Sequence, residues 1–259
     1  MNKTVTRHPA SFGVILTHFS ENSGIRHAFG TRRVLDQKSL ARTMDRLGLP
    51  VISVHQVHGD GILILDRPAR DGIVSKKRTE AEGFDSYDAI VTNQPGVVLA
   101  IRTADCLPVL MFDPEHRVIA AAHSGWRGSL QEVVPKTIRA MTARFSCRPQ
   151  ALLVGIGPSI RSCCYEVGDI VLAPLAARCP YWRDLVKEKG DLPAGQAGGK
   201  AMLDLQGLVH RQLLGLGVSP DRIEISEACT ACDPERFESY RRDGKAASSM
   251  WSGIVMEAA

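Results

Sequence analysis

The sequence contains no apolar run long enough to cross a membrane. A membrane-spanning helix needs about 20 consecutive, mostly apolar residues, and no run in this chain approaches that length. The start of the chain, residues 1–20, carries charged side chains around an apolar run that is too short for an export signal. We therefore expect a cytoplasmic protein that has no membrane partner.

The sequence also lacks a concentration of charge of one sign. Its 32 Lys and Arg residues nearly balance 28 Asp and Glu residues, giving a net charge of +4. The basic clusters at 75–78 and 240–245 are short, whereas nucleic-acid-binding proteins usually gather Lys and Arg in a stripe or patch. This pattern predicts no nucleic-acid partner.

The seven cysteines are an odd number, and without an export signal they favour reduced thiols in the cytoplasm. Most thiols of this kind are buried as small hydrophobic side chains, and the exceptions are metal ligands or nucleophiles. We interpret the neighbours Cys163 and Cys164 as structural. The segment "CTAC" (229–232) has C-x-x-C spacing, and both packing and a weak redox pair stay open for it.

Short apolar segments separated by turn residues predict a single α+β domain over residues 1–259. Several segments are apolar at nearly every position, which indicates strands buried on both faces. Apolar spacing predicts helices at 129–145 and 202–217, and Pro135 should kink the first helix or delay its start. Polar, turn-rich sequence predicts exposed loops at 67–86 and 190–200. The expected strands lie within 51–65 (two strands joined by a Gly-Asp-Gly turn), 88–93, 96–103, 107–112, 117–123 and 151–157.

A predicted hairpin holds the strongest indication of a functional site. Asp and Pro in "FDPEHR" favour a turn, and a loop of residues 113–116 would pair Phe112 with Arg117. In this register Cys106 lies directly opposite His123, with Cβ atoms about 4.5–5.5 Å apart on one face. That distance suits two ligands of one metal ion and equally a thiolate–imidazole catalytic pair. A slip of one residue would send the two side chains to opposite faces.

The segment "HSGWRG" after the second strand of this hairpin supports a site. Gly125 and Gly128 allow the backbone to approach a ligand closely. Arg127 offers a guanidinium fork for phosphate or carboxylate, whereas Trp126 is interpreted as a packing residue.

A metal site needs a third ligand, and "VHQVHGD" supplies two histidines. Strand alternation puts His58 on the same face as Gln56, while His55 points the other way. His58 is also better placed at the end of a sheet. Three protein ligands would leave one position of a tetrahedral zinc ion open, as in catalytic rather than structural zinc sites. The predicted metal ligands and catalytic residues are His58, Cys106 and His123.

The motifs "HQVHGD", "RTADCLPVL", "AAHSGWRG", "GIGPSIRSCCYEVG" and "SYRRDG" occur in the order seen in the YfiH family. The chain resembles this family from about residue 26 to 245. Its members are also described as laccase-domain or multicopper polyphenol oxidase proteins, as purine nucleoside phosphorylases and, for some relatives, as peptidoglycan editing factors. By this resemblance His58, Cys106 and His123 match the family's zinc ligands.

The resemblance implies a layered αββα fold with helices outside two mixed sheets, similar to the catalytic domain of the cytotoxic necrotizing factor. It implies a Zn²⁺ cofactor, phosphorolysis of adenosine, inosine, guanosine and methylthioadenosine, and deamination of adenosine. The partners would then be purine nucleosides and phosphate, bound by a monomer or homodimer. Copper is disfavoured because the ligand set lacks the many histidines of a multicopper oxidase.

Gln56, Arg127 and Gly157 are the candidate substrate contacts. The segment "GIGPS" (155–159) could bind an anion through its backbone or form only a strand-to-loop turn. Asp105 could orient a neighbouring group or cap a strand end, and the role of Arg241 stays open. The familiar zinc deaminase signature, with H-x-E before P-C-x-x-C, is absent.

Three segments depart from the family pattern: "FGTRRVLD" lacks a glycine pair, "GKAASSM" replaces the usual end, and 67–86 is long. These departures leave the preferred nucleoside open. Two other functions also stay open. One is a metal-free hydrolase with Cys106 as nucleophile and His123 as base, for example a peptidoglycan-editing amidase. The other is a non-catalytic binding protein of the same fold.

Overall fold

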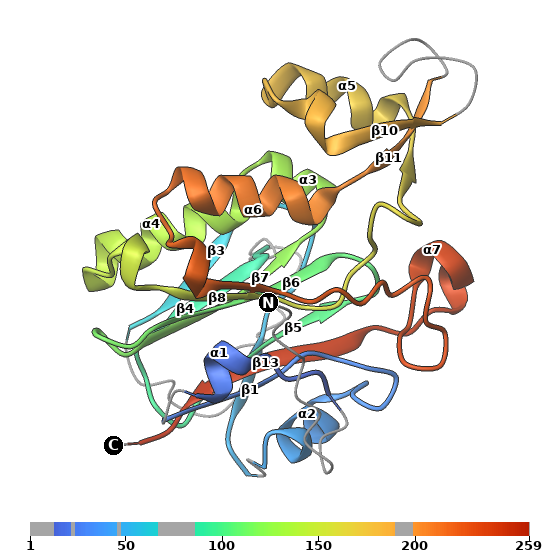
Figure 1. Cartoon of the computed structure of the whole chain (residues 1–259). Helices are drawn as coiled ribbons and strands as arrows, with labels where there is room; N and C mark the ends of the chain where they lie inside the picture. Colours follow the sequence, from blue (N-terminus) through green and yellow to red (C-terminus); the bar gives the residue numbers. More distant parts are fainter. Residues whose placement is uncertain (1–12, 22–23, 46–47, 67–85, 190–198, 259) are drawn as a thin grey trace, which may run out of the picture.

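The computed structural model describes residues 13–21, 24–45, 48–66, 86–189 and 199–258. In these residues two mixed sheets pack face to face and helices cover their outer faces (Figure 1). The expected α+β, αββα fold is confirmed. The larger sheet has the strand order β12 (Ile223–Ile225), β8 (Leu153–Ile156), β6 (Leu107–Asp113), β7 (Val118–Ser124), β4 (Ala89–Thr92) and β3 (Ile62–Leu65).

Two smaller sheets complete the strand framework. A four-stranded mixed sheet lies against the larger sheet, and a three-stranded antiparallel sheet lies near α5 (Figure 1). The four-stranded sheet has the order β1 (Ile25–Ala28), β13 (Met250–Met256), β5 (Val98–Thr103) and β2 (Val51–Ser53). The three-stranded sheet has the order β10 (Val186–Lys189), β11 (Lys200–Leu203) and β9 (Glu166–Val167).

Helices cover the outer faces of the two sheets, whereas α1 (Thr17–Ser20) packs against β1 of one sheet and β8 of the other. α4 and α6 lie over the six-stranded sheet, and α2 packs on the four-stranded sheet (Figure 1). The helices are α1 (Thr17–Ser20), α2 (Gln37–Thr43), α3 (Trp126–Leu130), α4 (Val133–Phe145), α5 (Asp169–Arg178), α6 (Leu205–Gly215) and α7 (Tyr240–Asp243). Within the described residues, no helix combines the length and apolarity that a bilayer-spanning segment requires.

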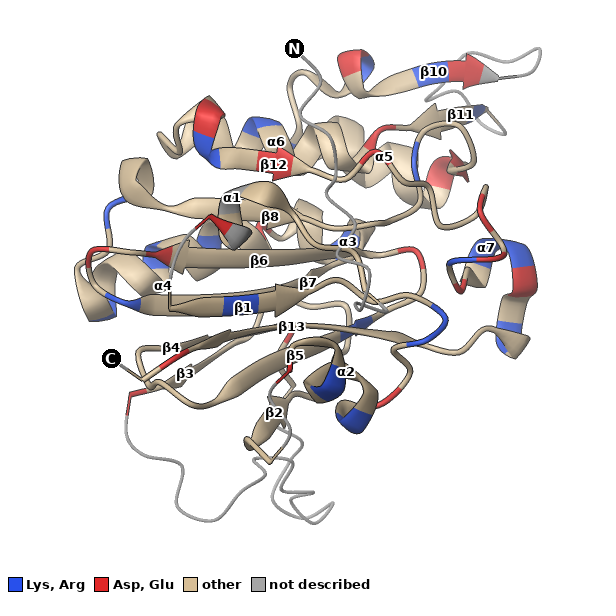
Figure 2. Cartoon of the chain, turned by 60° about the horizontal axis from the view of Figure 1, so that its bottom comes forward, with Lys and Arg blue, Asp and Glu red and all other residues tan. Residues whose placement is uncertain are grey.

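Strands β4, β6 and β7 are buried along their whole length, because each is covered on both faces. Alternate residues therefore belong to different cores. In β7, Ala120 and Ala122 join the cluster beneath the helices, whereas Ile119 and Ala121 join the cluster between the two sheets. A third cluster lies between the four-stranded sheet and α2. Figure 2 shows the same pattern from the outside, since charged residues occupy mainly helices and loops while β6 and β7 are almost entirely tan.

The predicted helix at 129–145 is divided into α3 and α4. Glu132, between them, adopts a left-handed conformation with φ of 62°, which ends one helix and starts the next. Pro135 lies in the first turn of α4, where its missing N–H breaks no intrahelical hydrogen bond. The expectation that Pro135 delays the helix is confirmed.

The predicted helix at 202–217 begins later than expected. The Asp204 side chain accepts a hydrogen bond from the Gly207 N–H at 2.9 Å and caps α6, while 202–203 belong to β11. The predicted loops at 67–86 and 190–200 lie almost wholly outside the described residues, except that Ser86 bridges to His55 and Lys200 already begins β11.

The two strands predicted within 51–65 exist, but they join different sheets. β2 pairs with β5 in the four-stranded sheet, and β3 pairs with β4 in the six-stranded sheet. The connecting segment, which contains His58, therefore passes from one layer to the other. This crossing places it at the edge where the two sheets meet.

Candidate metal and substrate site

The hairpin of β6 and β7 forms as predicted, but its predicted register is wrong. Asp113 pairs with Val118, and His123 pairs with Pro108 rather than with Cys106. The loop comprises residues 114–117. The Asp113 carboxylate accepts hydrogen bonds from the backbone N–H groups of residues 115 and 116, which stabilises a turn that begins after Asp113.

Cys106 and His123 nevertheless lie close together. Cys106 is in the bend immediately before β6, two residues before Pro108, which is directly opposite His123. The ligand atoms of Cys106 and His123 lie within 4.8 Å of each other. The predicted closeness of the two side chains is therefore confirmed, whereas their predicted direct pairing is wrong.

His58 reaches the same place from a loop and not from a strand. β2 ends at Ser53, so the strand alternation invoked for His58 does not extend to it. The residue instead adopts φ of 61° in the connection to β3. Its ring lies 4.8 Å from the ring of His123, edge to face. The potential ligand atoms of His58, Cys106 and His123 all lie within 4.8 Å of one another.

A buried aspartate, Asp88, positions both histidines. Its Oδ1 accepts a hydrogen bond of 2.7 Å from His123 Nδ1 and another of 3.0 Å from the His58 backbone N–H. Its Oδ2 accepts from the backbone N–H groups of Val57 and Gly59, at 3.2 and 2.7 Å. One carboxylate thus fixes the left-handed loop and the ring of His123. With Nδ1 donating to Asp88, His123 presents Nε2 as its free ligand atom.

The charges in this group reinforce one another when no metal ion is bound. Burial opposes ionisation of Asp88, but hydrogen bonds from His123 and Gly59 hold its pKa below the usual range. Burial also raises the pKa of the Cys106 thiol, but hydrogen bonds from His123 and His58 outweigh this and lower it to about 6. The pKa of His123 is lowered by burial and raised more strongly by Asp88 and Cys106, to about 9. The metal-free group is therefore a thiolate beside an imidazolium near neutral pH.

Two glycines after β7 provide room for this group. A Cβ on Gly125 would lie 2.9 Å from Cys106 Sγ and 3.1 Å from His58 Cδ2, and a Cβ on Gly128 would lie 2.9 Å from the Gly59 carbonyl oxygen. Distances this short force a neighbour to move. Both glycines were expected to let the backbone approach a ligand closely. In the structure they let it approach Cys106, His58 and Gly59. Trp126 packs against the core beneath the helices, as expected.

A cavity of about 660 Å³ opens beside the three potential ligands. It lies at one edge of the six-stranded sheet, where β6 begins and β7 ends. Two arginines supply positive charge to its wall. Its lining comprises Gln56, His58, Arg102, Thr103, Ala104, Asp105, Cys106, His123, Ile160, Tyr165, Tyr240, Arg241, Ala247 and Ser249.

The three predicted substrate contacts are placed differently from one another. Gln56 lines the cavity, but its side-chain amide forms two hydrogen bonds with the Arg102 backbone, at 2.7 and 2.8 Å. Arg127 is exposed on α3 and stacks over Trp126 at 4.3 Å, outside the cavity lining. Gly157 also lies outside the lining, and a Cβ there would meet the Phe29 ring at 2.1 Å. The space at Gly157 thus serves packing.

Several residues of the cavity wall were not assigned from the sequence. The Arg241 guanidinium lies over the Tyr165 ring at 5.2 Å and donates a 2.7 Å hydrogen bond to the Glu166 carbonyl oxygen. Burial beside Cys106 raises the pKa of the Tyr165 hydroxyl, which keeps it protonated. Asp105 accepts hydrogen bonds from the Thr230 hydroxyl and the Arg241 backbone N–H, at 2.5 and 2.6 Å. Of the two roles considered for Asp105, it performs the first.

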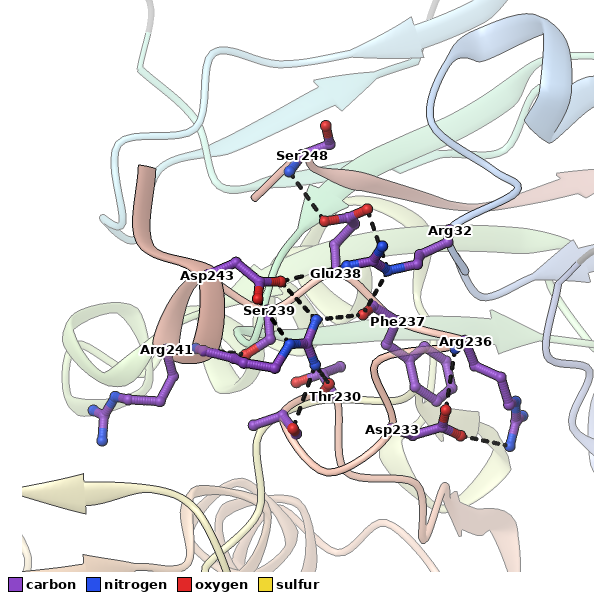
Figure 3. Close-up of polar contacts among 12 residues, drawn as sticks. Arg32, Thr230, Asp233, Arg236, Phe237, Glu238, Ser239, Arg241, Asp243 and Ser248 are labelled. Atoms are coloured by element: carbon purple, nitrogen blue, oxygen red, sulfur yellow. Dashed lines mark hydrogen bonds and ion pairs between the residues drawn. The ribbon is translucent and has the colours of Figure 1, made fainter. Parts of the chain in front are cut away.

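The C-terminal element around α7 is held by a dense polar network (Figure 3). Arg242 donates to the carbonyl oxygens of Thr230, Ala231 and Phe237 and pairs with Asp243. In Figure 3 the Arg241 side chain points away from this network. Arg241 lines the cavity, whereas Arg242 does not. The two neighbouring arginines thus divide their roles between structure and site.

Comparison with known proteins identifies the family. Residues 21–257 match the family described as multi-copper polyphenol oxidoreductase laccase, and the chain belongs to that family. The chain is similar to a purine nucleoside phosphorylase of Streptomyces coelicolor, with 37% identity over 204 residues, 78% of this chain and 74% of that protein. It is 29% identical over 227 residues to adenosine deaminase RL5 of an unknown prokaryotic organism, covering 86% of this chain and 81% of that protein. The solved structure of the YfiH protein of Bacillus licheniformis matches with a TM-score of 0.71 and 26% identity, covering 85% of this chain and 79% of that one.

Proposed function

We propose that His58, Cys106 and His123 bind one Zn²⁺ ion. Two imidazoles and a thiolate are ligands that zinc commonly takes, and three protein ligands leave a fourth position open toward the cavity. The absence of a Cβ at Gly125 leaves space beside Cys106 Sγ, and the Asp88 carboxylate behind His123 is the usual support of a zinc-bound histidine. The donor set and its surroundings therefore fit the ion.

On this basis the protein acts on purine nucleosides. Its reactions are phosphorolysis of adenosine, inosine, guanosine and methylthioadenosine, and deamination of adenosine. In phosphorolysis a phosphate oxygen bonds to C1′ of the sugar as the bond from C1′ to the purine breaks. In deamination a water oxygen bonds to C6 of adenine and ammonia leaves. The names of the relatives support both reactions, and Zn²⁺ supplies Lewis-acid activation when it is bound.

The chain's own residues supply binding and orientation. Arg102 and Arg241 both line the cavity, and guanidinium groups bind phosphate through paired N–H donors. Asp88 keeps His123 in one tautomer and holds the His58 loop. The protonated Tyr165 hydroxyl and Ile160 line the same cavity, so they shape the space that receives the nucleoside.

One observation carries this proposal: two imidazoles and a thiolate converge at a cavity that also holds two arginines. Its test is incubation of the purified protein with adenosine, with and without phosphate, followed by separation of adenine, inosine and hypoxanthine. We expect adenine only when phosphate is present and inosine in both samples. No product above that of a Cys106→Ala control would contradict the proposal.

Arg102→Ala separates the two reactions. Loss of a charge-assisted hydrogen bond costs roughly 1.5–3 kcal/mol, so the KM for phosphate should rise at least about tenfold. Deamination needs no phosphate and should change much less. Equal losses in both reactions would show that Arg102 does not bind phosphate.

A metal-free hydrolase with Cys106 as nucleophile is the second candidate. The lowered pKa of Cys106 and the raised pKa of His123 favour it, because a thiolate beside an imidazolium is an activated nucleophile. Metal analysis and alkylation separate the candidates. About one zinc ion lost in His58→Ala supports the zinc enzyme, whereas metal-free protein that reacts stoichiometrically with iodoacetamide at Cys106 supports the hydrolase. A metal-loaded protein that binds nucleosides without turnover would be a binding protein.

A further inference from the structure

Four cysteines outside the candidate site form a second cluster. Their sulfur atoms all lie within 4.8 Å of one another, and all four thiols are free. The distance from Cys232 Sγ is 3.2 Å to Cys164 Sγ and 3.5 Å to Cys163 Sγ, well beyond the 2.03–2.05 Å of a disulfide bond. The four-cysteine cluster comprises Cys163, Cys164, Cys229 and Cys232.

Parallel strand pairing brings these cysteines together. β8 and β12 are parallel neighbours, so the loops that follow them leave the sheet at the same edge. Cys163 and Cys164 lie in the loop after β8, and the C-x-x-C segment lies in the loop after β12. A bridge between Ser159 and Cys229 extends the pairing into both loops. The arrangement is thus a consequence of the topology rather than of chance side-chain contact.

The spacing of the sulfur atoms fits one tetrahedral metal ion. With Zn–S bonds of about 2.3 Å, the edges of a sulfur tetrahedron are about 3.8 Å. Two of the sulfur separations in the cluster, 3.2 and 3.5 Å, are slightly shorter than this value, and the others are no longer than 4.8 Å. Four thiolates in a tetrahedron are the usual ligands of structural zinc. We propose that Cys163, Cys164, Cys229 and Cys232 form a second, structural Zn²⁺ site.

The backbone around Cys229 independently favours a metal-bound thiolate. Burial raises the pKa of the Cys229 thiol, but the nearby backbone N–H groups of Arg161, Cys232 and Ala231 outweigh this and lower it. Two of these donors come from within the C-x-x-C turn itself, so the turn folds its N–H groups around the first cysteine. Such donors stabilise negative charge on sulfur. Cys229 is also buried, where an unpaired thiolate would be costly.

The second site would fasten two loops that form the wall of the cavity. The Cys164 loop carries Ile160 and Tyr165, which both line the cavity. The loop after β12 carries Thr230 (Figure 3). The Thr230 hydroxyl donates to Asp105, and its carbonyl oxygen accepts from Arg242. The ion is therefore expected to stabilise the wall without touching the substrate. Its presence does not depend on the proposed enzymatic activity.

Zinc content measured by mass spectrometry, on full-length protein purified with reductant and without chelator, tests the site. The Cys106→Ala background removes the proposed catalytic zinc and isolates the second site. There we expect about one zinc ion per chain, in keeping with a single closed four-cysteine site, and none after addition of Cys232→Ser. Cys179→Ala in the same background is the matched control, because Cys179 is buried outside both clusters, and it should retain the ion.

A second variant and a second measurement distinguish loss of the metal ligand from misfolding. Cys163→Ser changes an exposed residue and should also release the ion, while the far-ultraviolet circular dichroism keeps its shape. Replacement by Co²⁺ should give intense sulfur-to-cobalt absorption that either variant abolishes. Zinc that persists in both variants overturns the proposal. Reduced protein without zinc, or protein with Cys163, Cys164, Cys229 and Cys232 joined in disulfides, also overturns it.

Discussion

The chain holds two groups of sulfur- and nitrogen-containing ligands that are built in opposite ways. The group of His58, Cys106 and His123 is anchored by a buried carboxylate and faces a cavity. The four-cysteine cluster has four sulfur donors, two of them on exposed residues. With one tetrahedral ion bound to each, as proposed, the first group would leave one coordination position for another ligand and the second would leave none. Zinc with three protein ligands does chemistry, and zinc with four holds chain segments together.

The two groups also differ in how they depend on the rest of the fold. His58 and His123 come from different segments and meet because Asp88 contacts both. The cysteines meet because two parallel strands end side by side. Loss of a single support should therefore disturb the first group more than the second.

Replacement of Cys106 should give the largest effect and the sharpest contrast. A catalytic zinc ion contributes several kcal/mol of transition-state stabilisation, so Cys106→Ala should lower kcat/KM for adenosine roughly 10³-fold. Cys232→Ser should mainly lower the thermal midpoint and raise KM. The comparison fails if Cys232→Ser lowers kcat as much as Cys106→Ala does. Steady-state assays and thermal unfolding of both variants decide this.

Asp88→Asn should have the next largest effect. It keeps the shape of the side chain but weakens the support of His123, and loss of such support costs about 10–100-fold in metal affinity or activity. Asp60→Asn is the matched control in the same loop, because Asp60 makes an ion pair with Lys136 at the surface. Zinc titration with a competing chelator should distinguish the two variants. Equal affinities would mean that Asp88 does not support the metal site.

The stability of the zinc-free protein should depend on pH through Cys106 and His123 in opposite directions. The pKa of Cys106 is lowered from 9.0 to about 6, so its contribution is complete above pH 9.0 and is lost as the pH falls through about 6. The pKa of His123 is raised from 6.5 to about 9, so its contribution is complete below pH 6.5 and is lost as the pH rises through about 9. These changes offset each other in the wild type, whereas Cys106→Ala keeps only the loss at His123, whose pKa Asp88 still raises. The Tm of zinc-free Cys106→Ala should therefore fall more steeply than that of the wild type as the pH rises above 6.5. Equal pH dependence of the two proteins would contradict the coupling.

Gly125→Ala should have the smallest of these effects. The backbone of Gly125 is extended, with φ of −78°, so alanine is tolerated conformationally and only its Cβ is in conflict with Cys106 Sγ. Overpacking of this kind costs about 1–3 kcal/mol, and zinc affinity should fall as well. Gly215→Ala is the matched control, since nothing lies within 4 Å of its Cβ. Chemical denaturation of both variants measures the difference.

The sequence predicts the layers and the closeness of Cys106 to His123 because the apolar strands and the turn between them are visible in the sequence. The observed pairing partner of His123 is Pro108, two residues from the predicted partner, so the predicted register is wrong. The exact bounds of the hairpin loop could not be predicted from the sequence, because they depend on hydrogen bonds that the Asp113 side chain accepts.

Other parts of the site could not be predicted from local patterns. Asp88 acts through four hydrogen bonds to distant residues, and its own sequence context is that of an ordinary strand start. The four-cysteine cluster depends on the pairing of β8 with β12, which periodicity does not reveal. Strand alternation predicts the face of His58, but the residue lies in a loop with a left-handed backbone. Contacts between distant segments therefore determine these parts of the site, and local sequence patterns do not encode them.

The attachment of the His58 loop has one further consequence. Asp88 holds this loop by its backbone, through Val57, His58 and Gly59, so the loop does not rely on the imidazole of His58 for its shape. The His58 side chain is exposed toward the cavity. Removing that imidazole should leave a solvent-accessible hole of the same outline. Dissolved imidazole could enter it and restore the third donor, which makes His58→Ala a variant that a small molecule can complement.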